Sequence, residues 1–229
     1  MNFKNQFYLI LFFLMSLILL PAQSQPSNPL HQAIDNYMQK TIQLHQIPGA
    51  ALAVIKNGKV IHQQYYGKAS LEQNTLVDAK SMFRIYSTTK LITVVGIFQL
   101  IEQGKLSQED DIGKYLPHLP TTWKSVKVKH LLTHSSGIPD LIRLPGNLSE
   151  QGLMAKLVKQ PMEFPTGKLF HYNQTNYWLL AQIIAKVSQT SFEEFILKNQ
   201  FMIAQNNPKT GVFFSSKSTN SIPNRIVKF

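Results

Sequence analysis

The chain has 229 residues and carries 23 Lys and Arg against 12 Asp and Glu, a formal charge of +11. It has no cysteine, which excludes disulfide bonds and a lipid-modified N-terminal cysteine. The positive charge suits nucleic acid or an anionic cell-wall surface, but basic residues concentrate only in the short run 124–130. We interpret that run as a solvated strand or helix entry, and we expect no nucleic acid partner.

The first 24 residues have the features of a signal peptide. A basic start is followed by an unbroken apolar run over residues 7–20, and Ala22 and Ser24 are small residues at the spacing that a signal peptidase reads. The run is shorter than the ~20 residues that span a bilayer easily, although an uncleaved anchor stays the alternative. We therefore expect an exported, periplasmic or secreted protein with one domain over residues 25–229, and membrane contact only without cleavage.

Local patterns in the first half predict a helix, a hairpin and a second helix. Residues 29–44 place apolar side chains at mostly helical spacing. Asn57-Gly58 lies between two β-rich runs and is the strongest short hairpin signal in the chain. Residues 91–101 are apolar on nearly every side, which predicts a central, buried helix that ends at Gly104.

The second half is expected to be mainly helical. A short helix and a loop with Gly and Pro are predicted in residues 128–140, and a longer helix over residues 174–188. Ser191 is placed to cap a further helix, with Glu194 in the capping-box position. The polar tail from Gln205 is expected to be poorly ordered. Helices combined with a hairpin indicate an α/β or α+β arrangement.

Ser87 and Lys90 are three residues apart at the head of the predicted central helix, so they share one face. The positive end of the helix dipole and apolar neighbours both favour a neutral Lys90 amine, which can activate a hydroxyl as a nucleophile. By itself the spacing is a weak signal. Ser87 as a helix cap beside an exposed Lys90 is the alternative.

Several blocks around this pair resemble, in order and spacing, the serine beta-lactamase and penicillin-binding-protein superfamily, particularly its class C-like and esterase-like branch. The resemblance covers residues 31–214 and rests on segments such as "IPGAALAVIK", "FRIYSTTK" and "LLTHSSGIPD". It implies an α+β fold of the beta-lactamase/transpeptidase type. It also implies that Ser87 is the acylated serine and that Lys90 is its base partner.

The same resemblance assigns roles to two residues in "FHYNQTNYWLLAQII". Tyr172 falls on the tyrosine that, in this branch, accepts or relays the proton from the serine and the leaving group. Gln174 falls on a position that normally holds Asn. Its amide keeps the donors and the acceptor one methylene further out, so it can still orient the substrate carbonyl or Lys90. The alternative for Tyr172 is a loop aromatic with a satisfied hydroxyl.

The family's third element, a Lys-Thr-Gly or His-Thr-Gly on a sheet strand, has an apparent match in Lys209-Thr210-Gly211. We interpret this match as a decoy, because in the family that strand lies near the C-terminus, after a long further segment. The resemblance thus implies that the C-terminal strands and helix are missing, leaving a strand edge uncovered. The Ser87 amide can supply one oxyanion donor, but the second has no evident source.

Other candidate sites are weaker. His130 and His134 stand four apart, but no Glu follows His130 and no third ligand suggests itself, so we expect no metal and no cofactor. Asp110 and Asp111 sit in a predicted turn and are expected to be solvated.

Two hypotheses follow. In the first, the chain is a serine hydrolase that acylates Ser87, with a beta-lactam, a D-alanyl cell-wall peptide or a small ester as substrate. In the second, it is a truncated, catalytically weak or inactive relative, a gene fragment or a cell-wall-binding module. The sequence leaves the substrate and the oligomeric state open.

Overall fold

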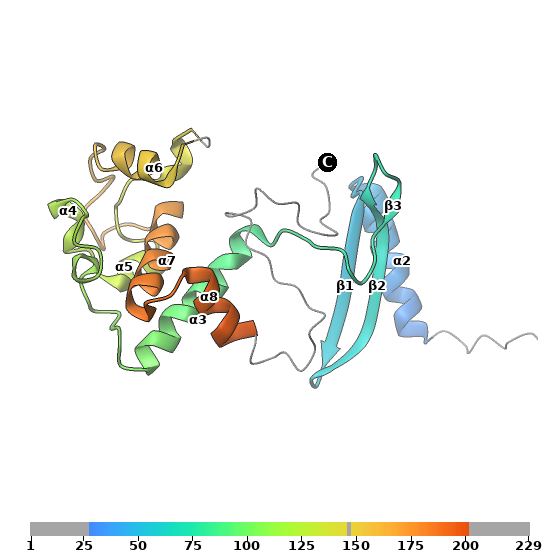
Figure 1. The fold of residues 1–229 in the computed structure, drawn as a ribbon. Coiled ribbons are helices and arrows are strands. Elements are labelled where there is room, and N and C mark those ends of the chain that lie inside the picture. The colour runs from blue at the N-terminus through green and yellow to red at the C-terminus, as the bar shows by residue number, and fades with distance from the viewer. Residues whose placement is uncertain (1–27, 146–147, 202–229) are drawn as a thin grey trace, which may run out of the picture. The chain divides into compact units, whose positions relative to one another are not determined.

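The computed structural model describes residues 28–145 and 148–201, and these form two compact units that divide between Phe83 and Arg84. The first unit contains a helix and a small antiparallel sheet, and the second is built from helices (Figure 1). This is the predicted α+β composition. None of the helices in the described ranges is long and apolar enough to cross a membrane.

The first unit consists of helix α2 (Pro29–Leu44) and strands β1 (Gly49–Lys56), β2 (Lys59–Ser70) and β3 (Thr75–Leu76). The strands pair antiparallel in the order β1-β2-β3, and α2 contacts β2. Among the described strands β1 therefore pairs on one edge only, as the sequence predicted.

Local signals placed these elements correctly. The predicted helix has the observed bounds of α2, and the side chain of its N-cap Asn28 accepts a hydrogen bond from the Leu30 amide at 3.0 Å. The hairpin turn is Asn57-Gly58, with φ values of 51° and 72°. Two consecutive positive φ angles characterise the type I′ turn, whose twist matches that of the flanking strands.

A polar cluster joins α2 to β2. The Tyr66 hydroxyl donates a hydrogen bond to Asp35 Oδ1 at 2.6 Å, and His62 Nε2 lies 3.1 Å from the same oxygen. Burial, followed by the bond to Asp35, raises the pKa of Tyr66 to about 12. Tyr66 therefore stays protonated and keeps donating to the helix across the physiological range.

The helices of the second unit are α3 (Thr89–Glu102), α4 (Thr121–Lys124), α5 (Val128–Leu132), α6 (Glu150–Leu157), α7 (Gln174–Ser188) and α8 (Phe192–Ile196). Short turns of other helix types are η1 (Tyr86–Thr88), η2 (Ile112–Lys114), η3 (Leu141–Arg143) and η4 (Leu197–Phe201). The bounds of α7 are those predicted, and Ser191 caps α8 by accepting from the Glu194 amide at 3.2 Å. The basic run 124–130 contains the predicted helix entry, since α5 begins at Val128.

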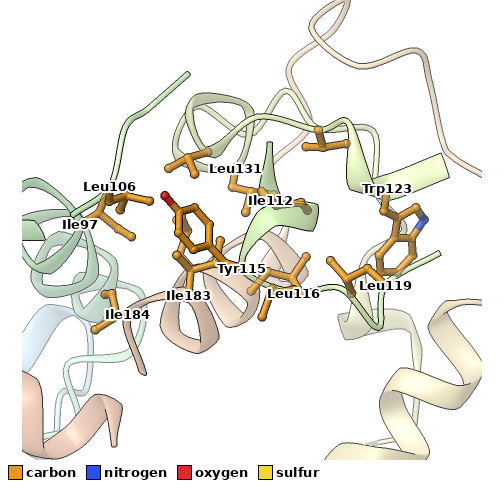
Figure 2. Close-up of a cluster of buried hydrophobic side chains, with 14 of the residues drawn as sticks. Ile97, Leu106, Ile112, Tyr115, Leu116, Leu119, Trp123, Leu131, Ile183 and Ile184 are labelled. Carbon is orange, nitrogen blue, oxygen red and sulfur yellow. The ribbon is translucent and has the colours of Figure 1, made fainter. Parts of the chain in front are cut away.

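The hydrophobic core of the second unit connects segments that are far apart in sequence (Figure 2). Ile97 of α3, the loop residue Leu106, Trp123 of α4 and Leu131 of α5 are all at most 5% exposed. Helix α7 adds Ile183 and Ile184, which have no exposed surface. This packing holds the N-terminal ends of α3 and α7 in a common framework.

Helix α3 differs from its prediction. It buries Ile97 and Leu100, but three apolar residues at i, i+4 and i+7 are exposed: Leu91, Val95 and Phe98. The expectation of burial on nearly every side is therefore wrong for the described structure. The reason is that α7 and α8 pack on one face of α3, where a Cβ at Gly96 would meet Ile184 and Ile196 at 3.1 Å. The predicted end is confirmed, because Gly104 follows the helix with φ 68°.

The packing of α7 makes a stability prediction. We expect Ile183→Val to lower the free energy of unfolding by about 0.5–1.5 kcal/mol, because a buried methylene is lost and a small cavity remains. Ile142→Val is the matched control, since Ile142 is 66% exposed and should change stability by less than about 0.5 kcal/mol. Urea denaturation of both variants measures the difference, and equal midpoints would contradict the assigned core.

Candidate active site

The four residues singled out in the sequence lie together in the second unit. Ser87 is in η1, Lys90 is in the first turn of α3, and Tyr172 and Gln174 flank the N-terminus of α7. Lys90 Nζ donates a 2.8 Å hydrogen bond to Gln174 Oε1 and lies 3.4 Å from Ser87 Oγ. The stronger contact of Lys90 is thus with Gln174, and its contact with Ser87 is long for a hydrogen bond.

Tyr172 completes this group. Lys90 Nζ lies 4.6 Å from the centroid of its ring. The proximity of Lys90, followed by that of Ser87, lowers the pKa of Tyr172 below its ordinary value. A cationic neighbour favours the phenolate over the phenol, so a larger fraction of this tyrosine is available as a base.

The backbone before Ser87 is unusual. Tyr86 has φ 42°, in a region that side chains other than Gly, Asn and Asp seldom occupy, and its side chain is 67% exposed. Strained residues of this kind cluster at functional sites. Here the turn leads from η1 directly into α3, where Thr88 is the N-cap and makes no side-chain capping bond. The alternative of Ser87 as a helix cap is therefore wrong.

The loop that follows α5 holds Gln174 in place through its backbone amide. The Gln174 amide donates to Asp140 Oδ1 at 3.0 Å, and Asp140 is 4% exposed. Asn173 caps α7 by accepting from the Asn176 amide at 3.1 Å and donates its own side-chain amide to the Ile138 carbonyl. Sequence reasoning missed Asp140, although it stands in the quoted block "LLTHSSGIPD". Its role depends on a contact 34 residues along the chain, which no local pattern displays.

A cavity of about 450 Å³ opens beside Ser87 and Lys90. It runs between α3 and the face of α7 formed by Gln174, Tyr177, Trp178 and Ala181, which are spaced i, i+3, i+4 and i+7. The other lining residues are Tyr86, Thr89, Thr93 and Phe192. The lining thus combines polar side chains, among them Ser87 and Lys90, with aromatic and apolar ones. A volume of this size accommodates a small organic substrate.

The other segments singled out in the sequence lie outside this group of four residues. Lys209-Thr210-Gly211 and the predicted signal peptide, residues 1–24, lie outside the described residues, so both interpretations stay predictions. Asp111 is exposed as expected, but the expectation is wrong for Asp110, whose carboxylate accepts bonds from the Tyr115 hydroxyl and from Lys114 Nζ. Those bonds, that from Tyr115 foremost, lower the pKa of Asp110.

His130 and His134 each use Nδ1 to accept a backbone hydrogen bond, from Lys127 at 3.1 Å and from Asn173 at 3.0 Å. These are structural contacts in two different places. His134 lies against Tyr172, whereas His130 lies near Gly167.

Comparisons with known proteins agree with this geometry. The Beta-lactamase family model matches residues 30–204. Protein flp of Staphylococcus aureus (strain MRSA252) is 28% identical over 179 residues, which are 74% of this chain and 36% of that protein. PbpX of Bacillus subtilis (strain 168) is 30% identical over 171 residues, 75% of this chain and 42% of that protein.

Solved structures show the same similarity. An octameric penicillin-binding protein homologue from Pyrococcus abyssi superposes with a TM-score of 0.70 at 27% identity, covering 85% of this chain and 47% of that one. A class C beta-lactamase in complex with cefoxitin superposes with a TM-score of 0.66 at 28% identity, covering 73% and 47%. The chain therefore spans less than half the length of these relatives. Since the family model covers more than half of the chain and the fold agrees with that of its members, the chain belongs to the Beta-lactamase family.

Proposed function

We propose that this chain is a serine hydrolase that works by acylation of Ser87. The observation that carries the proposal is the grouping of Ser87, Gln174 and the ring of Tyr172 around Lys90, beside a cavity that Ser87 lines. A nucleophile, a base with a shifted pKa and a residue that orients the base are the components of nucleophilic catalysis by serine.

The proposed roles follow from the contacts. Tyr172 accepts the Ser87 proton as Oγ attacks the substrate carbonyl. Lys90 then stabilises the phenolate through its charge, in place of the neutral-amine role expected from the sequence. When the bond from the carbonyl carbon to the leaving group breaks, Tyr172 returns the proton to that group. Water then releases the acyl group from Ser87 by the same steps in reverse. Gln174 holds Lys90 in place and can contact the substrate carbonyl.

Three substrate classes fit this chemistry: a beta-lactam, a D-alanyl cell-wall peptide and a small ester. Two structural neighbours carry the names class C beta-lactamase and D-alanine carboxypeptidase AmpC, the latter from Burkholderia cenocepacia. In a beta-lactam the leaving nitrogen stays attached through the opened ring, so labelling of Ser87 is readily observed. All three substrates are small molecules or short peptides, and the site as proposed uses no cofactor.

The test is covalent labelling of the full chain with a fluorescent penicillin and, separately, with a fluorophosphonate, in which Ser87 displaces fluoride from phosphorus. We expect one label per chain, lost in Ser87→Ala. Ser135→Ala is the matched control, because Ser135 lies outside the cavity and its hydroxyl pairs with Thr133 at 2.9 Å. Absence of labelling in a sample that melts cooperatively would contradict the proposal.

A weak or inactive relative that binds cell wall is the second candidate. It is favoured by the composition of the oxyanion site in the part of the chain that the structure describes. Within residues 28–145 and 148–201 we assign one donor, the Ser87 amide, and removal of one donor typically slows turnover by about 10²–10³. Binding to isolated cell walls that is equal in the wild type and Ser87→Ala, without labelling of either, would establish this function.

We also propose that the protein is exported, periplasmic or secreted, on the basis of the N-terminal segment in the sequence. N-terminal sequencing of the protein from fractionated cells tests this. A mature protein that begins at Gln25 supports it, and an intact Met1 in the cytoplasmic fraction would contradict it.

A further inference from the structure

His134 is a buried histidine behind the candidate active site. It follows α5 with φ 56°, and it is 7% exposed. The centroid of its ring lies 4.6 Å from that of Tyr172, 5.1 Å from that of Tyr177 and 5.9 Å from that of Phe170. Lys90 Nζ lies over the same two tyrosine rings, at 4.6 and 5.4 Å. His134 and Lys90 therefore pack against the same two tyrosine rings.

His134 accepts backbone hydrogen bonds from the residues on both sides of Tyr172. The amide of His171, one residue before Tyr172, donates to the His134 carbonyl at 2.9 Å. The amide of Asn173, one residue after it, donates to His134 Nδ1 at 3.0 Å. These two bonds hold the peptide units 170–171 and 172–173, one on each side of Tyr172, and so restrict where its hydroxyl points.

The bond from Asn173 depends on the protonation state of the imidazole. A backbone N–H can only donate, so Nδ1 must present its lone pair, and the ring proton of neutral His134 must reside on Nε2. In the imidazolium both nitrogens carry protons. Protonation therefore replaces an acceptor by a donor and turns an attractive contact with the Asn173 amide into a repulsive one.

We propose that His134 is a positioning residue for Tyr172, which holds the tyrosine hydroxyl at Ser87 and Lys90 only while the imidazole is neutral. The proposal rests on the proposed function of Ser87 and Tyr172. His134 does not itself line the cavity in the described structure, although it packs on the lining residue Tyr177. We infer that it acts through Tyr172 and the turn at Asn173.

Burial and the neighbouring charges together favour the neutral ring of His134. Burial is the largest influence and lowers its pKa, and the Lys90 ammonium lowers it further. Asp140 acts in the opposite direction, while His171, which is paired with Glu163 at 2.6 Å, lowers the pKa slightly. Tyr172 and Tyr177 also face the ring and are uncharged in their phenol forms. The folded protein therefore binds this proton less readily than the unfolded chain does.

The sign of the pH effect follows. Below the ordinary histidine value of 6.5 the unfolded chain takes up a proton that folded His134 resists, so stability falls as pH falls toward the lowered pKa. Near that pKa the Asn173 bond is lost in the protonated fraction. Below that pKa, the rate constant of Ser87 acylation should therefore fall by about a further tenfold per pH unit, which adds an acid limb to its pH profile.

The first measurement does not depend on activity. In ¹⁵N spectra of the full chain, the Asn173 amide should titrate together with the His134 ring, and its protection factor against solvent exchange, corrected for the intrinsic pH dependence of exchange, should fall at acid pH. His134→Asn keeps an acceptor oxygen close to the position of Nδ1, tolerates a positive φ and cannot ionise. In that variant the Asn173 titration should vanish. The proposal would be overturned if the chemical shift of the wild-type Asn173 amide did not change as His134 titrates.

The second measurement is the pH profile of labelling by the fluorophosphonate. We expect His134→Asn to keep labelling at neutral pH within about threefold and to lose the extra acid limb. His134→Ala should lower the labelling rate constant by more than tenfold with little change in reagent affinity. His130→Asn is the matched control, because His130 also accepts a backbone bond through Nδ1 and has a lowered pKa but does not touch Tyr172. Its profile should equal that of the wild type.

The outcomes separate the two proposals. An unlabelled wild type refutes acylation of Ser87. The Asn173 titration still tests whether His134 holds the backbone on both sides of Tyr172. A labelled wild type whose acid limb persists in His134→Asn refutes the role of His134 and leaves the proposed function intact. Equal effects of His130→Asn and His134→Asn would show a general stability effect and would also refute it.

Discussion

Tyr172→Phe is expected to slow acylation of Ser87 by about 10²–10⁴-fold, the usual contribution of a positioned general base. The substitution removes the hydroxyl whose pKa Lys90 and Ser87 lower, but keeps the ring that packs on His134. Because Tyr172 is 43% exposed, the melting temperature should change little. Rate constants of labelling, measured with saturating and subsaturating fluorophosphonate, separate the loss of rate from a loss of affinity.

Tyr115→Phe is the control for this variant. The Tyr115 hydroxyl donates to Asp110 at a distance from the cavity, so its removal should cost about 1 kcal/mol of stability and leave labelling unchanged. If Tyr172→Phe labels as fast as the wild type, Tyr172 is not the base, and the assignment of proton transfer is wrong.

Lys90→Met is expected to slow acylation by about 10²–10³-fold and to move the rising limb of the pH profile to higher pH. Met preserves the apolar stem but removes the charge and the hydrogen bond to Gln174 Oε1. Lys90 is the main cause of the lowered pKa of Tyr172, so without it that pKa should return toward its ordinary value of 10. The phenolate would then form only at more alkaline pH.

Lys114→Met provides the matched control. Lys114 also lies over a tyrosine ring, 5.2 Å from the centroid of Tyr115, but on the surface and outside the cavity. Its labelling profile should follow that of the wild type. A slower Lys90→Met enzyme with an unshifted profile would mean that Lys90 acts on Ser87 or on substrate, and not through the ionisation of Tyr172.

Local chemistry was sufficient to predict much of the fold. The spacing of apolar residues and the caps gave the bounds of α2 and α7, and Asn57-Gly58 identified the hairpin, because these signals act between residues close in sequence. Helices α4 and α6 were not predicted. They have four and eight residues, too few for a distinct periodic pattern, and neither has the capping-box pattern that indicated α8.

The candidate site shows the same division between local and long-range information. The spacing of Ser87 and Lys90 was a weak signal by itself, and all four candidate residues were singled out because their blocks resemble a known family. The sequence alone therefore predicted the family, the main helices and the hairpin, and it named four candidate site residues whose roles remain proposals.

Only the tertiary structure decided how these residues interact. Lys90 bonds more closely to Gln174 than to Ser87, one face of α3 is exposed, Asp140 anchors Gln174, and His134 brackets Tyr172. These contacts join residues that are 34 to 84 positions apart. Their distances and protonation states depend on burial and on charges brought together by folding, and a linear pattern of residue types contains neither.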